Sequence, residues 1–179
     1  LAGQFHKVVL AIRRMNIPWI AAINGSCFGV GLSIACFCDL RIASTAAKFS
    51  VAFTGVGLSP DSGLLHYLPK IVGLAKATEM TFLNITISAE EALKCNLITK
   101  ISKPEDLLKD SMDMAKILVN MPTFTLGKDK KQLDASYTLP LDQHLELELK
   151  NVSETADTAD FQEGCAAFFE RRKPHFQGK

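Results

Sequence analysis

The apolar residues of the chain first recur at helical spacing and then form short strand-like runs. The helical positions are Phe5, Val8, Val9, Ile12 and Met15. This spacing predicts an amphipathic helix that ends before Pro18. Short apolar runs typical of strands then occupy residues 19–23, 39–43, 48–51 and 97–101. Residues 32–38 are apolar nearly all round, which predicts a helix buried on every side.

Two polar patterns in the same part of the chain predict helix starts. Ser59 and Pro60 suit the beginning of a helix, with serine as the cap and proline at the first helical position. The sequence SAEE at residues 88–91 is a capping box. The order of these strands and helices indicates an α/β layer architecture.

After residue 103 the pattern becomes helical throughout. Two apolar stripes comprise Leu107, Leu108, Ser111, Ala115, Leu118 and Val119, and then Leu141, Leu145, Leu149 and Val152. Asp160 with Glu163 is expected to cap a last helix that carries Phe161, Cys165, Phe168 and Phe169. Little sheet is predicted for these faces to cover, so we expect them to pack against a neighbouring subunit. The predicted division is an α/β core at residues 1–102 and a helical oligomerisation region at residues 103–179.

The composition is that of an ordinary soluble globular protein. Of 179 residues, 47% are hydrophobic and 22% are charged, with a net charge of +1 and no basic arm, so nucleic acid is not expected as a partner. The five cysteines are Cys27, Cys36, Cys38, Cys95 and Cys165. They show no metal-ligand spacing, and we expect free thiols and no metal site. We therefore predict a reducing compartment, either the cytoplasm or, in a eukaryote, an organelle such as the mitochondrion or peroxisome.

One charge-free segment, residues 17–38, is long enough to span a membrane. The turn signal Asn24-Gly25 interrupts it, so we interpret it as a buried strand and a buried helix, and expect no membrane partner. The chain starts at Leu1 inside a helical pattern, without a methionine or a signal segment. We therefore expect it to be the later part of a longer protein.

A lone carboxylate and a glycine-rich turn are the candidate chemistry. Asp61 is the only acidic residue between Asp39 and Glu79, and residues 24–31 form a glycine-rich turn before the predicted buried helix. If the fold brings the two together, one supplies a base and the other supplies backbone N–H groups for an oxyanion. This combination suits an enzyme that moves protons next to a carbonyl.

Several motifs in order along the chain resemble those of the crotonase (enoyl-CoA hydratase/isomerase) superfamily. They are PWIAAING at 18–25, GVG at 29–31, CDLRIA at 38–43, Phe49, GLSPDSG at 57–63, LPKIVG at 68–73, ATEM at 77–80, ISAEEA at 87–92 and EGCAAFFERRKP at 163–174. The resemblance implies a spiral of strand–strand–helix units with a helical C-terminal trimerisation region. It also implies a coenzyme A thioester as substrate, no separate cofactor, and a homotrimer or a dimer of trimers. The family's N-terminal part, which carries half of the adenine pocket and one oxyanion donor, has no counterpart here.

The resemblance also assigns roles to single residues. Val30, between two glycines at a helix start, is expected to donate its N–H to the thioester oxygen. The expected substrate-binding residues are Ala21, Phe28, Gly29, Gly31, Phe53, Leu58, Phe168 and Arg171. The last two match positions that reach across the trimer to the adenine and phosphates of coenzyme A. The alternative is that the glycines only form a tight turn, and that Phe168 and Arg171 are ordinary packing and surface residues.

Two further positions decide which reaction is expected. The hydratases of the family hold water with two glutamates, and those positions fall on Ser33 and Phe53 here. The same positions carry acids in dienoyl-CoA isomerases, so neither activity is expected. Asp61 falls where 3-enoyl-CoA isomerases and epoxyphenylacetyl-CoA isomerases place their acid. An apolar surround from Phe28, Phe53 and Leu58 should make this carboxylate a stronger base.

We therefore predict an acyl-CoA isomerase of fatty acid metabolism in which Asp61 shifts a double bond from the 3- to the 2-position. One alternative is a hydratase-like enzyme of low efficiency, and another is a homologue that binds acyl-CoA without turnover. Asp61 has an alternative role as well, because acids are favoured in the first turn of a helix. His66 is expected to be a packing or surface residue.

Overall fold

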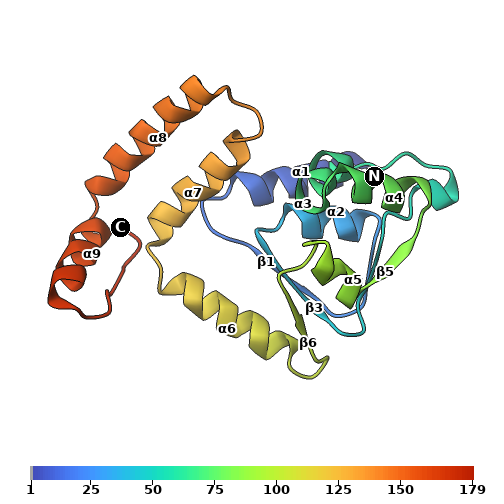
Figure 1. The fold of residues 1–179 in the computed structure, drawn as a ribbon, viewed down its shortest axis with the longest axis horizontal. Coiled ribbons are helices and arrows are strands. Elements are labelled where there is room, and N and C mark those ends of the chain that lie inside the picture. Colours follow the sequence, from blue (N-terminus) through green and yellow to red (C-terminus); the bar gives the residue numbers. More distant parts are fainter. Residues whose placement is uncertain (1) are drawn as a thin grey trace. The chain divides into compact units, whose positions relative to one another are not determined.

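The computed structural model describes residues 2–179, which divide into two compact units. The first unit comprises the chain up to Arg14 together with Trp19–Asp113. The second comprises Met15–Pro18 together with Met114–Lys179. Helices and strands alternate in the first unit, whereas the described residues of the second form helices and loops (Figure 1).

The first unit is built from repeated strand–strand–helix segments that follow the opening helix α1 (Ala2–Arg14). The repeats are β1 (Ile20–Ile23), β2 (Ser26–Phe28) and α2 (Val30–Phe37), then β3 (Leu40–Ser44), β4 (Lys48–Ser50) and α3 (Leu64–Val72). The unit continues with α4 (Leu74–Phe82), β5 (Thr86–Ser88), α5 (Ala89–Lys94), β6 (Lys100–Ser102) and the first part of α6 (Leu107–Val119). A 3-10 turn, η1 (Thr54–Val56), lies between β4 and α3.

Each repeat sends its two strands to different sheets. β1, β3 and β6 form one parallel sheet, in which Ile20 lies opposite Leu40. β2, β4 and β5 form the other, in which β2 and β4 are parallel and β4 and β5 are antiparallel. Because each helix returns the chain to the next place in the same pair of sheets, the chain advances as a spiral. This arrangement confirms the predicted α/β fold class.

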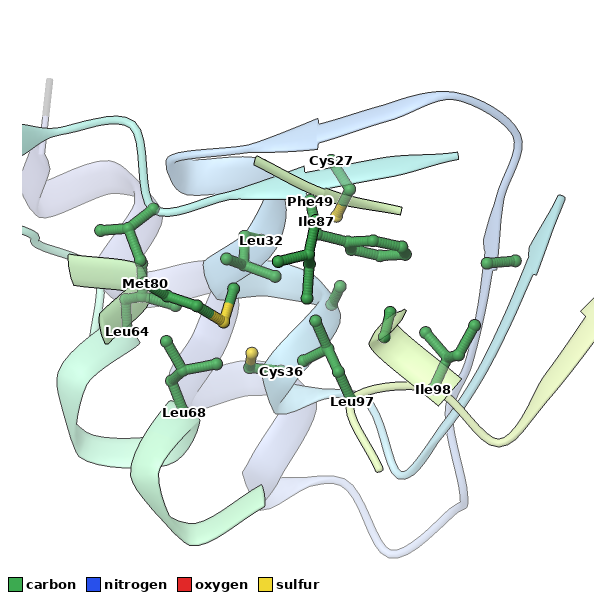
Figure 2. Packing of buried hydrophobic residues seen from close by; sticks show 14 of the residues in the cluster. Cys27, Leu32, Cys36, Phe49, Leu64, Leu68, Met80, Ile87, Leu97 and Ile98 are labelled. Carbon is green, nitrogen blue, oxygen red and sulfur yellow. The ribbon is translucent and has the colours of Figure 1, made fainter. Parts of the chain in front are cut away.

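The main core of the first unit fills the space between the second sheet and the helices (Figure 2). Phe49 of β4 and Ile87 of β5 meet Leu32 of α2 there, and all three side chains are 0–1% exposed. Leu68 of α3 and Met80 of α4 join the same cluster. Burying a side chain of this size contributes about 1.5–3 kcal/mol, so this cluster fixes where α2 and α3 lie.

The structure corrects several predicted boundaries. The helix predicted to start at Ser59-Pro60 begins at Leu64, because the chain first turns through Ser62 and Gly63 in the left-handed region, with φ of 52° and 74°. Asp61 therefore lies in a loop, which removes its alternative role in a first helical turn. β2 and β5 were not predicted, since each has only three residues. The last strand covers Lys100–Ser102, later than the predicted 97–101.

Of two predicted helix caps, the structure has one as predicted and one at another residue. The capping box is confirmed, since the Ser88 side chain accepts a hydrogen bond from the Glu91 amide at the start of α5. The predicted cap at Asp160 is wrong. Thr158 caps α9 (Ala159–Glu170) by accepting from the Phe161 amide. The Asp160 carboxylate instead accepts from the Gln177 and Gly178 amides at 2.6 and 2.8 Å, so it ties the C-terminal residues back to α9.

Of the two predicted apolar stripes, the first is partly covered, since Leu107 and Ser111 are buried. The second unit leaves the stripe at residues 141–152 largely uncovered. It holds the end of α6, α7 (Thr123–Ala135), α8 (Leu141–Ala156) and α9. Leu141, Leu145, Leu149 and Val152 of α8 are 53–74% exposed. Phe168 and Phe169 of α9 are 79% and 82% exposed. Such contiguous apolar surface is typical of a face that a partner covers.

The cysteines of the described chain are all free thiols. Burial raises the pKa of Cys27 and that of Cys36 to about 12 each, so neither is a thiolate near neutral pH. Among residues 2–179, no helix combines the length and apolar character needed to cross a membrane.

Replacing Arg41 should destabilise the first unit. Its guanidinium donates to the Leu97 and Cys38 carbonyls, each at 2.6 Å, so it holds the end of α2 to the segment before β6. Arg41→Met leaves these acceptors unpaired, and we expect a loss of about 2–4 kcal/mol in the free energy of unfolding, measured with urea. Arg14→Met at an exposed position is the control and should change it by less than about 0.5 kcal/mol. Equal effects would contradict the assigned role.

The hold on the C-terminal residues should depend on pH. Hydrogen bonds from Arg172 and from the His175 amide lower the pKa of Glu163 to about 2. A carboxyl group whose pKa falls on folding stabilises the fold above its ordinary pKa of 4.5, and this stability is lost as the pH falls towards 2. The difference in unfolding free energy between wild type and Glu163→Gln should be constant above pH 5 and shrink below about pH 4. A flat difference for Glu163 would contradict the assignment.

Candidate active site

The start of α2 presents backbone amides without a capping group. Gly29, at φ 54° and ψ −121°, is the cap residue, and it provides no side-chain acceptor. This backbone conformation strains a residue that has a Cβ, so glycine is required here. The first amides of a helix have no acceptor within the helix. The Val30 N–H therefore has no acceptor within α2, and its role as a donor to a substrate oxygen stays a prediction.

A compact turn at residues 53–58 lies against Gly29. The Phe53 carbonyl accepts from the Val56 and Leu58 amides at 3.1 and 3.0 Å, which closes the turn on itself. The Phe53 ring lies 3.7 Å from the point that a Cβ on Gly29 would occupy. An apolar ring thus covers the glycine that precedes Val30.

Asp61 lies in a tight turn that also holds its carboxylate. The Leu64 amide donates to the Asp61 carbonyl at 3.1 Å, and the two residues between are both left-handed. The Ser62 hydroxyl donates to Asp61 Oδ1 at 3.0 Å. Ser62 is buried, whereas Asp61 is half-buried. One oxygen of the carboxylate is thus anchored while the residue stays partly accessible.

Ser33 connects the two candidate catalytic segments. Its side chain is fully buried, and its hydroxyl oxygen lies 3.3 Å from the Gly29 carbonyl and 3.4 Å from the Asp61 carbonyl. Ser33 is one helical turn after Val30. The fold therefore brings Asp61 to the glycine-flanked start of α2, although the two are far apart in sequence.

The other predicted site residues of the first unit lie in β1, at the end of β2, in the turn at residues 53–58 and in the first turn of α2. Phe28 ends β2 and is 39% exposed, Leu58 is 61% exposed, and Gly31 is exposed in the first turn of α2. Ala21 is half-buried in β1 opposite Arg41. The exposed apolar side chains of Phe28 and Leu58 are suited to contact an apolar ligand.

Phe168 and Arg171 belong to the second unit. Phe168 is exposed on α9 and packs edge to face on Phe169, with ring centroids 5.8 Å apart. Arg171 ends the helix in the left-handed region at φ 55°. The neighbouring Arg172 is paired with Glu163 and Glu170, so of these two arginines Arg171 is the one suited to bind an anion.

Sequence reasoning missed an apolar groove of about 460 Å³ in the second unit. It is lined by Pro122, Thr125, Thr155, Asp160, Phe161, Gly164, Cys165, Phe168, Phe169 and Phe176. The phenylalanines of α9 signalled an apolar face, but the part played by Phe176 depends on the C-terminal residues folding back.

His66 is exposed, and its Nε2 lies 2.8 Å from Lys70 Nζ. The prediction that His66 is a packing or surface residue is confirmed, since it lies at the surface. No group of three or more potential metal ligands occurs among the described residues. The candidate site offers one carboxylate and one amide at a helix start. The carboxylate can move a proton on a carbon beside a carbonyl, and the amide can donate a hydrogen bond to the oxygen of that carbonyl.

Known proteins share both the sequence and the fold of this chain. Residues 1–179 match the family model described as Enoyl-CoA hydratase/isomerase. A "Probable enoyl-CoA hydratase" of Rhodobacter capsulatus is 36% identical over 100% of this chain and 70% of its own length. The 1,2-epoxyphenylacetyl-CoA isomerase of Escherichia coli is 34% identical over 98% of this chain and 67% of its own length.

The crystal structure of an enoyl-CoA hydratase from Polaromonas sp. JS666 superposes with a TM-score of 0.93 at 29% identity, over 98% of this chain and 68% of that one. Because the family model covers every residue, the chain belongs to the enoyl-CoA hydratase/isomerase family.

Proposed function

We propose that this protein is an acyl-CoA isomerase that converts a 3-enoyl-CoA to a 2-enoyl-CoA. The observation that carries the proposal is the contact of the Ser33 hydroxyl with the Asp61 backbone carbonyl, which holds the loop of Asp61 against α2 one helical turn after Val30. A 1,3-proton shift needs one group that removes and returns a proton, and one carboxylate suffices. The relative from Escherichia coli named as an isomerase supports the same class of reaction.

The proposed reaction moves one proton and changes no oxidation state of the enzyme. Asp61 removes a proton from C2, and the C2–H electrons form an enolate conjugated with the C3=C4 bond. The Val30 N–H donates to the enolate oxygen, and one such donor contributes roughly 3–4 kcal/mol in other oxyanion holes. Asp61 then returns the proton to C4, which leaves the double bond between C2 and C3.

Hydration is less well supported by the same residues. Activating water needs a polar group that orients and deprotonates it. The Ser33 hydroxyl is directed at backbone carbonyls, and Phe53 presents an apolar ring. The relative from Rhodobacter capsulatus is nevertheless named as a hydratase, so hydratase activity of low efficiency is the second candidate. A homologue that binds acyl-CoA without turnover is the third outcome.

We further propose that the active form is a homotrimer or a dimer of trimers. The exposed apolar faces of α8 and α9 support this assembly. Phe168 and Arg171 are then proposed to contact the adenine and phosphates of coenzyme A bound to a neighbouring copy. A reducing compartment is proposed from the free cysteines. A role in fatty acid β-oxidation is proposed from the isomerase activity.

Replacing Asp61 with asparagine should abolish the isomerase activity. The amide keeps the size of the side chain but cannot accept the C2 proton, so we expect kcat to fall by about 10²-fold or more. The measurement follows the rise in ultraviolet absorbance as a 3-enoyl-CoA becomes conjugated. The exposed Asp106→Asn variant is the control and should keep wild-type turnover. Unchanged turnover in Asp61→Asn would exclude the proposed mechanism. If the wild-type enzyme hydrates a 2-enoyl-CoA to a hydroxyacyl-CoA faster than it isomerises a 3-enoyl-CoA, the hydratase is favoured instead.

The turn that carries Asp61 should tolerate only glycine at position 63. Gly63 has φ 74°, and a Cβ there would lie 2.6 Å from Cζ of Phe37. Gly63→Ala should therefore lower the free energy of unfolding by about 1–3 kcal/mol, measured with urea. Gly25→Ala is a matched stability control, because nothing lies within 4 Å of the point that a Cβ on Gly25 would occupy. Equal stability of the two variants would show that this turn is not constrained.

A further inference from the structure

A residue far from the predicted motifs covers the turn at residues 53–58. Asn84 follows α4, and its side chain lies directly on Gly55 of η1. A Cβ on Gly55 would lie 3.1 Å from Cγ and 3.5 Å from Oδ1 of Asn84, and closer still to Nδ2. Asn84 and Gly55 therefore fit together only because Gly55 has no side chain.

The turn can transmit this contact to the candidate site. Its three internal hydrogen bonds, from Val56 and Leu58 to the Phe53 carbonyl and from Gly57 to the Thr54 carbonyl, make it a single compact body. The Phe53 ring at one end of the turn lies against Gly29, which precedes the Val30 amide. A shift of the turn at Gly55 therefore moves the ring over the start of α2.

Two residues next to the turn at residues 53–58 adopt unfavourable conformations or contacts. Ala52, immediately before Phe53, is left-handed at φ 62°, which is uncommon for alanine. In the described structure Asn84 Oδ1 is buried without a hydrogen-bond partner, and Asn84 itself is left-handed at φ 48°. Neither feature stabilises the fold, and backbone strain of this kind concentrates at functional sites.

We propose that Asn84 is a positioning residue that acts through Gly55 to hold the Phe53 ring over Gly29. The inference rests on the proposed function for its effect on catalysis, but the hold on the turn can be measured without any substrate. Among the hydrogen bonds of the described residues, none joins Asn84 to Asp61 or Val30, so we expect Asn84 to act on the reaction through the turn.

The test removes the carboxamide without straining the backbone. Asn84→Gly is suitable because glycine adopts a positive φ readily. Asn96→Gly is the matched control, since Asn96 is also left-handed, at φ 63°, but exposed at the end of α5. Deuterium uptake by the Val56, Gly57 and Leu58 amides should increase in Asn84→Gly and stay at the wild-type level in Asn96→Gly. Unchanged uptake in Asn84→Gly would overturn the proposal.

The kinetic readout separates positioning from general stability. We expect Asn84→Gly to lower kcat for the 3-enoyl-CoA about 10-fold, since small displacements at a site cost this much or more, with KM nearly unchanged. Gly55→Ala, which forces the carboxamide away, should have a similar effect. The two changes together should cost no more than one alone, because both break the same contact. Additive losses, or wild-type kcat in Asn84→Gly, would overturn the catalytic part of the proposal.

The outcomes also distinguish this inference from the proposed function. If Asp61→Asn keeps full activity while Asn84→Gly increases uptake at residues 56–58, the proposed mechanism fails and the hold of Asn84 on the turn stands. If Asp61→Asn is inactive and Asn84→Gly matches Asn96→Gly in uptake and kcat, the mechanism stands and Asn84 has no positioning role.

Discussion

The buried hydroxyl of Ser33 is the contact on which the candidate site depends. It lies between the carbonyl oxygens of Gly29 and Asp61, and so between the start of α2 and the loop before α3. The helices carrying these segments are fixed by the core, where Leu32 and Leu64 are fully buried. A carboxylate and a free amide are useful together only if their separation is constant, and rigid packing on both sides of Ser33 provides that constancy.

Much of the fold could be predicted from local patterns. The helical spacing of Val8, Val9 and Ile12 predicted α1, and the serine and glutamate of the capping box predicted the start of α5. The predicted start of α3 was wrong, because Ser62 and Gly63 form a left-handed turn and a serine in the sequence gives little sign of that conformation. The short strands β2 and β5 were missed because three residues carry too little pattern, and pairing in the sheet creates them.

For the candidate site, too, features that depend on neighbouring residues could be predicted, whereas contacts between distant segments could not. Asp61 and the glycine-rich turn could be proposed because a lone acid and closely spaced glycines are visible in the sequence, and the family resemblance implied Val30 as the donor within that turn. That they meet could not be derived from spacing, since Ser33 and Asp61 are 28 residues apart and their contact needs the packed helices. Asn84 gave no signal at all. Its contact with Gly55 joins two loops, and only the folded chain shows that a Cβ there has no room.

The distribution of backbone strain supports the placement of the site independently of any motif. In the described part of the chain, the left-handed residues other than glycine are Ala52, Ser62, Asn84, Asn96 and Arg171. Ala52 precedes Phe53, Ser62 binds the Asp61 carboxylate, and Asn84 covers Gly55. Each such conformation costs of order 1–3 kcal/mol and persists only where the surroundings impose it. Ala52 and Ser62 lie in the segment between β4 and α3 that carries Phe53 and Asp61, and Asn84 contacts that segment at Gly55. Strain that stability alone would not favour is thus concentrated in the segment that holds the candidate base, which is a physical reason to assign the site there.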